Sequence, residues 1–300
     1  MKIARTAVAL VVTLSLAHAA AAQTPGPVLA VSSDAKVTVI STGTGPKRAL
    51  RYKAVAGSKE RLDMTMKMSV EVAIPGEGAQ AMDAPAVNMG MNIDITSVSP
   101  NGDIGVALVI TEASMEGAGI PPGVLDPVKG LAAAMTMTPR GHVKEMKFDE
   151  SKIVDPMMKQ VLSSSGLDRL AAPMPEEEVG VGAKWVVEQA LDANGIQMTQ
   201  KSTFEVVAMD ATSTTLALAL EQSAAEQKIT PPGMPGNVSA TIVEMKGTGT
   251  GQMALVDGVM ALVGEMQLKS NVTMDISAEG QQQRMTTATG MKMTIARGKR

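Results

Sequence analysis

An almost unbroken alternation of apolar and polar residues runs from Leu62 to Ile74. The apolar positions are Leu62, Met64, Met66, Met68, Val70, Val72 and Ile74. A period of two is the period of a β-strand with one apolar face and one solvated face. At about 3.3 Å per residue the segment would span roughly 40 Å, far more than the usual strand of about 5 to 6 residues. The pattern therefore predicts a large curved sheet rather than a small sandwich.

Shorter alternating segments follow along the chain and are joined by turn sequences. Asn101-Gly102 lies between two such segments, and Pro139-Arg140-Gly141 lies between two more. Asn-Gly between alternating segments is a strong indication of a β-hairpin. The second half continues in the same way, with turns at 192–195, 210–212, 257–258 and 279–280. We therefore expect a mainly β protein with a large curved antiparallel sheet or open barrel of about 10–12 strands.

One segment has the pattern of a helix instead. Asp155 precedes Pro156, which is a favoured arrangement at a helix N-terminus, and apolar residues recur at helical spacing as far as Gly166. We predict one helix at about 156–164, packed on the apolar face of the sheet. An acidic, proline-rich stretch at 172–182 then leads into the second half of the chain.

The order of these segments suggests the domain organisation. Residues 47–300 are expected to form a single β domain. The alternative is two related halves, 47–150 and 183–300, joined by the helical and proline-rich connector. An internal duplication is not demonstrated by the residues themselves, which align poorly between the halves.

The N-terminus has the features of a secretory signal peptide. Lys2 and Arg5 are followed by a short apolar segment at 7–16 and by small residues up to Ala22. We expect cleavage before Gln23, and a periplasmic or secreted location. The alternative is a retained N-terminal anchor helix, although the apolar segment is short for a bilayer span. No later segment is apolar for long enough to span a membrane, so no transmembrane segment is expected in the mature chain.

The segment at 23–46 is rich in Pro, Gly, Ser and Thr, and it predicts a flexible leader with one loosely attached strand around Val37–Val39. Without the predicted signal peptide, the 27 basic residues become 25, against 30 acidic ones. This modest negative charge, without a basic stripe, argues against nucleic acid as a partner. The absence of cysteine excludes disulfides, which a chain of this length does not need.

Residues that could carry chemistry are few. After the predicted signal peptide His142 is the only histidine, so histidine-based triads and zinc sites are not expected. The acidic run at 176–178 is typical of a solvated loop rather than of a calcium site. The glycines at 247–251 lack the Lys-Ser or Lys-Thr of a phosphate-binding loop, and they indicate close backbone approach or a bend in a curved strand. No catalytic residue, cofactor or metal site is therefore assigned, and we expect a protein that is not an enzyme.

Methionine is the most unusual feature of the composition. The chain has 25 Met but only one Trp, one Tyr and two Phe. Pairs of the form Met-x-Met recur along the predicted strands, and such pairs place both side chains on one face. Methionine can fill a core that lacks aromatics, line an adaptable apolar groove, or bind Cu(I) through its thioether. The candidate groove residues are Met64, Met66, Met68, Met89, Met91, Met291 and Met293.

The chain also resembles a known group of proteins. The segment Pro175–Trp185 (PEEEVGVGAKW), followed by Gly247–Gly251 (GTGTG) and by Asp257-Gly258, is similar to a family of exported bacterial β proteins of unknown function. In that family a PxxxVxVGxxW segment precedes the second half, and a GxGxG strand precedes a turn. The similarity covers about residues 49–295. It implies an architecture similar to the lipoprotein-localisation fold, an open antiparallel barrel clasped over a helix, and an exported location.

The functional expectation follows from compartment, fold and methionine content together. We expect a non-enzymatic exported protein of the bacterial envelope that binds a lipid or an apolar peptide in a groove lined by methionine. The first alternative is a structural or assembly component of the envelope with no small ligand. The second alternative is a Cu(I)-binding, methionine-rich protein.

Overall fold

The computed structural model describes residues 35–74, 78–117, 120–149, 171–193, 195–229, 238–278 and 281–299. In this part of the chain nearly all regular structure is β, apart from a 3₁₀ turn at Asp126–Val128. The predicted mainly β class is therefore confirmed. The predicted helix at about 156–164 and the predicted signal peptide at 1–22 lie outside the described residues. No helix within the described ranges is long and apolar enough to cross a membrane.

Among the described residues, one antiparallel sheet contains fourteen strands. Along its main path the strands follow the order β1 (Lys36–Ser41), β10 (Lys184–Ala193), β11 (Ile196–Met209), β12 (Ser213–Ala224), β14 (Val238–Val256), β15 (Val263–Ala278), β16 (Gln281–Arg297), β3 (Lys59–Ile74), β5 (Ala86–Val98), β6 (Ile104–Glu116), β7 (Ala132–Met137) and β8 (Val143–Phe148). The short strands β4 (Gly78–Asp83) and β13 (Gln227–Ile229) pair with β3 and β14. A separate two-stranded sheet consists of β2 (Thr44–Ala49) and β9 (Glu178–Val181).

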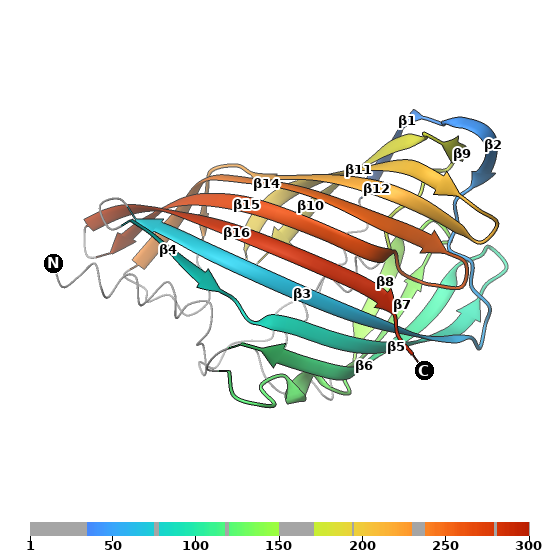
Figure 1. Ribbon diagram of the computed structural model, residues 1–300, viewed down its shortest axis with the longest axis horizontal. Helices are drawn as coiled ribbons and strands as arrows, with labels where there is room; N and C mark the ends of the chain where they lie inside the picture. Colours follow the sequence, from blue (N-terminus) through green and yellow to red (C-terminus); the bar gives the residue numbers. More distant parts are fainter. Residues whose placement is uncertain are drawn as a thin grey trace.

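The large sheet is strongly curved and open. Figure 1 shows the long strands β14, β15, β16 and β3 side by side, with β7, β8 and β10 behind them. Within the described residues the two end strands, β1 and β8, do not pair with each other. The predicted curved, open sheet is thus confirmed. Its strand number exceeds the expected 10–12 because β4 and β13 are short additions at the sides of β3 and β14.

The long strand predicted at Leu62–Ile74 forms most of β3. Leu62, Met64 and Val72 are buried, whereas Lys67 and Glu71 are exposed. The alternation in the sequence therefore corresponds to an inner face that packs on the core and an outer face in solvent.

Two of the predicted turns show why their residues suit them. Gly102 has φ +85° between β5 and β6, and Gly195 has φ +81° between β10 and β11, in a region that favours glycine. At the turn between β11 and β12, Asp210 accepts hydrogen bonds from the hydroxyl of Ser213 and from the backbone N–H groups of Thr212 and Ser213. These bonds, the Ser213 hydroxyl first, lower the pKa of Asp210 to about 2.

The second part of the leader predicted at 23–46 lies within the described residues. Residues 36–41 form the edge strand β1, which pairs with β10, and residues 44–49 form β2. The strand predicted around Val37–Val39 lies within β1, and distant strands supply the partners of both β1 and β2. Val37 and Val39 point to the main core, and Val39 lies opposite Trp185. A local sequence rich in Gly and Ser gives little sign of such a long-range pairing.

Two apolar clusters lie along the inner face. The main cluster takes residues from both halves of the chain and contains Trp185, whose ring stacks on Phe204 with centroids 5.4 Å apart. The smaller cluster is centred further along the same strands and consists of Leu191, Met198, Ile229, Ala240, Ile242 and Met245. The part of the inner face between these clusters is where the candidate site lies.

Candidate functional site

The methionines predicted to line an apolar groove lie on one face of three adjacent strands, β16, β3 and β5. The antiparallel register places Met66 opposite Met293 and Met68 opposite Met291. The remaining members are Met64, Met89 and Met91, which continue this face on β3 and β5. The structure thus brings all of these residues to the inner face, although they come from three separate parts of the sequence.

Their exposure divides them into two groups. Met91 and Met64 are 0 % and 3 % exposed and belong to the main core. Met68 is 37 % exposed, and the half-buried members are Met66, Met89, Met291 and Met293. The buried members therefore fill the core, whereas the methionines toward Met68 form a continuation of the core that remains partly accessible.

Two apolar residues that sequence reasoning did not include extend this surface onto β15. Met266 lies opposite Met293, and Leu268 lies opposite Met291; both are half-buried. Their alternation is visible in the sequence, but it does not show which strand lies beside them. We call this accessible surface the methionine face, defined by Met66, Met68, Met266, Leu268, Met291 and Met293.

A column of glycines borders the methionine face on β14. A Cβ atom added to Gly249 would lie 2.6 Å from the carbonyl oxygen of Gln267, and one added to Gly251 would lie 2.7 Å from that of Glu265. The glycines therefore permit β14 and β15 to approach more closely than other residues would allow. This agrees with the close backbone approach expected for the glycines at 247–251.

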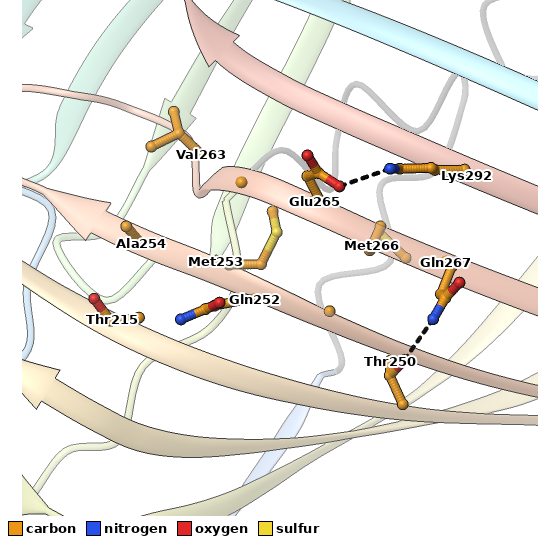
Figure 2. A pocket seen from close by; sticks show the side chains of 12 residues that line it. Thr215, Thr250, Gln252, Met253, Ala254, Val263, Glu265, Met266, Gln267 and Lys292 are labelled. Carbon is orange, nitrogen blue, oxygen red and sulfur yellow. Dashed lines mark hydrogen bonds and ion pairs between the residues drawn. The ribbon is translucent and has the colours of Figure 1, made fainter.

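A hollow of about 670 Å³ is lined by polar and apolar residues of β12, β14, β15 and β16 (Figure 2). Glu265 and Lys292 point toward each other there and form an ion pair at 2.8 Å. The amide of Gln267 donates a hydrogen bond to the hydroxyl of Thr250 at 3.3 Å. These side chains satisfy one another, and they alternate with the inward-facing residues of the same strands. Met266, a member of the methionine face, also lines the hollow, so the two surfaces share this residue.

The other residues considered from the sequence have structural partners. His142 is half-buried, and burial followed by the nearby charge of Arg140 lowers its pKa. Arg140 also lies 3.5 Å from the carboxylate of Glu176, and the carbonyl of Glu176 accepts a hydrogen bond from Arg51. The acidic run is therefore placed beside arginines, which is a poor setting for a calcium ion.

Within the ranges that the structure describes, no group of three or more His, Cys, Asp or Glu side chains is placed to hold a metal ion. What the site offers chemically is an adaptable apolar surface of thioethers next to a rigid core. No protein-family model matches the chain, and no curated protein matches its sequence. The resemblance to a family of exported bacterial β proteins therefore stays a prediction.

Proposed function

We propose that this chain is a non-enzymatic exported protein of the bacterial envelope that binds the acyl chain of a lipid on the methionine face. The observation that carries the proposal is the register of β15, β16 and β3, which continues the core as a partly accessible methionine surface. Methionine side chains are flexible and polarisable, so they adapt to apolar ligands of varied shape. The signal-peptide pattern of residues 1–22 supports the exported location.

A lipid suits this surface better than an apolar peptide. An extended peptide gains most of its affinity by adding to the free edge of a sheet, where its backbone finds hydrogen-bond partners. The methionine face lies on β15, β16 and β3, which are interior strands of the sheet with both edges paired over most of their length. A peptide on this face would leave backbone polar groups without partners, whereas an acyl chain has none to satisfy.

The proposal is tested with a pyrene-labelled hydrocarbon and purified protein, in which binding is followed by fluorescence. Replacing Met68 and Met291 together by glutamine keeps the side-chain length but removes apolar surface, and we expect affinity to fall about tenfold. Replacing the same residues by leucine keeps the surface apolar and should change affinity by less than about threefold. Native mass spectrometry after gentle extraction from the envelope should show a bound lipid on the wild-type protein.

Two results would overturn the proposal. The first is a wild-type protein that neither binds the hydrocarbon probe nor carries lipid from the envelope. The second is a glutamine variant that binds the probe as tightly as the wild type, since the ligand would then lie elsewhere.

One observation favours the alternative of an assembly component. Ile40, on the edge strand β1, is 63 % exposed, and β1 pairs on one side only within the described residues. An exposed apolar residue on a free edge is suited to the addition of a strand from another protein. In that case Ile40→Lys should abolish the association in envelope cross-linking, while the hydrocarbon probe should not bind to the wild type.

A further inference from the structure

A row of polar side chains crosses the inner face beside the methionine face. Gln189, Gln200 and Gln222 are direct neighbours on β10, β11 and β12. The same row continues through Gly247 on β14 to Ser270 and Thr289 on β15 and β16. We call the five residues that carry side-chain polar groups the polar row: Gln189, Gln200, Gln222, Ser270 and Thr289.

The position of the polar row is unusual because most of the residues around it are apolar, with Ser202 and Thr287 as polar members of the two flanking rows. Its members are half-buried, and they separate the main cluster around Trp185 from the smaller cluster around Met198. Two residues further along β15 and β16 lie Leu268 and Met291 of the methionine face. Half-buried polar groups in such a place are unfavourable unless hydrogen-bond partners are supplied.

The described residues supply only part of the hydrogen bonds that this row can make. The amide of Gln222 donates to the carbonyl oxygen of Gln200 at 2.8 Å, and the amide of Gln200 donates to the hydroxyl of Ser202 at 3.4 Å. Each amide has two N–H groups and a carbonyl oxygen with two lone pairs. Among the described residues these bonds use one N–H of each amide, so donors and acceptors remain for a ligand.

The row and its neighbours carry no formal charge. Among the described residues, both flanking rows of the inner face consist of uncharged residues. The row on one side contains Val187, Ser202, Leu220, Gly249, Leu268, Met291 and Met68. The row on the other side contains Leu191, Met198, Ala224, Met245, Val272, Thr287 and Val72. A carboxylate or phosphate placed here would lose its hydration without meeting a cation, which is strongly unfavourable. An uncharged group that accepts hydrogen bonds meets no such penalty.

We infer that the polar row binds the ester group of an uncharged acyl lipid, whose acyl chain lies on the methionine face. The inference rests on the function proposed above and adds the chemical class of the ligand. Glutamine N–H groups donate to the ester carbonyl, and the hydroxyls of Ser270 and Thr289 contact the glycerol side of the ester. From Thr289 to Met293 the strand spans about 13 Å, which accommodates a long part of an acyl chain.

The test compares three pyrene-labelled probes with the same chain: a hydrocarbon, a fatty acid at pH 8, and a monoacylglycerol. The test variant is Gln200→Leu with Gln222→Leu, which removes the hydrogen-bonding groups but keeps similar volume. The matched control is Gln252→Leu with Gln267→Leu, since these glutamines are exposed on the outer face. Thermal unfolding verifies that both variants are folded before binding is measured.

We expect the wild type to bind the monoacylglycerol more tightly than the fatty acid. The ratio of monoacylglycerol affinity to hydrocarbon affinity should fall about tenfold in the inner-face variant and stay unchanged in the outer-face control. A ratio unchanged in both variants would overturn the role of the polar row and leave the proposed function standing. Failure of the wild type to bind any of the probes would overturn both.

Two further outcomes identify a different ligand. Tighter binding of the fatty acid than of the monoacylglycerol would show that the assignment of an uncharged group is wrong. The second outcome concerns competition for the labelled monoacylglycerol. The assignment of a lipid would be overturned if an apolar acetylated peptide amide displaced this probe at a lower concentration than unlabelled monoacylglycerol does.

Discussion

Replacing Gly249 by alanine places a methyl group between β14 and β15 where the two strands are close. The added Cβ would lie 2.6 Å from the carbonyl oxygen of Gln267, so the strands must move apart by at least about 0.4 Å to restore a 3.0 Å contact. Overpacking of this kind costs about 1–3 kcal/mol. The lower entropy of the unfolded alanine chain offsets about 0.4–1 kcal/mol of that. We expect a net destabilisation of about 1–2 kcal/mol.

Gly290→Ala is the matched control for this change. Gly290 also lies within a long strand, β16, but its added Cβ would approach only the hydroxyl oxygen of Ser69, which can rotate away. The control should be between unchanged and about 1 kcal/mol more stable. Thermal unfolding followed by circular dichroism should show a midpoint about 2–6 °C lower for Gly249→Ala than for the wild type. Equal midpoints for the two variants would refute the argument that the glycine column sets the spacing of β14 and β15.

Three further predictions concern the inner face, copper and acid stability. Met66→Asp should lower the free energy of unfolding by about 2–4 kcal/mol because it places a carboxylate on the inner face. Lys67→Asp, on the outer face, should change the free energy of unfolding by less than about 0.5 kcal/mol. Equal urea midpoints for the two variants would contradict the assignment of faces. Replacing Met64, Met66 and Met68 together by leucine should lower the free energy of unfolding by less than about 1.5 kcal/mol per site. Competition with a Cu(I) chelator should show no stoichiometric copper in the wild type or in the variant. Tight Cu(I) binding by the wild type that is lost in the variant would favour the copper alternative. The pKa of Asp210 is lowered from 3.8 to about 2, so its stabilising effect is present above about pH 4 and is lost as the pH falls toward 2. Asp210→Asn should therefore flatten the pH dependence of the urea midpoint in that range. An unchanged slope would count against the hydrogen bonds of the turn.

The parts of the fold that could be predicted are those in which one strand face meets the core and the other meets water. Leu62 and Lys67 on β3 are an example, since burial alone decides which face each occupies. Turns with glycine at positive φ, such as Gly102, are also local and were predicted. By contrast β1 depends on its partner β10, about 150 residues away, and its own sequence gives only Val37 and Val39 as a signal.

The candidate site was predictable only in some of its members, since Met266 and Leu268 were not expected and Met64 and Met91 are buried in the core. The Met-x-Met pairs indicated that Met66 and Met68 share a face, as the structure has them. The register of β15 and β16 places Met266 beside Met293, and the sequence of either strand alone does not show that Met266 continues the methionine face. The polar row was missed for the same reason: Gln200 and Gln222 lie on different strands, and only the pairing of the strands makes them a row.

The pairing of β16 with β3 has a consequence for how the protein folds. These strands join positions more than 200 residues apart, as between Met66 and Met293, and their ladder closes the gap between the two meanders of the sheet. Until β16 has been synthesised, the apolar strand β3 has one open edge along most of its length, and such an edge readily pairs with other chains. Contacts between distant segments also slow folding, because a long loop must close before they form. The long sheet is therefore completed only after β16 is available, and a chaperone that shields β3 during that interval would raise the yield of folded protein.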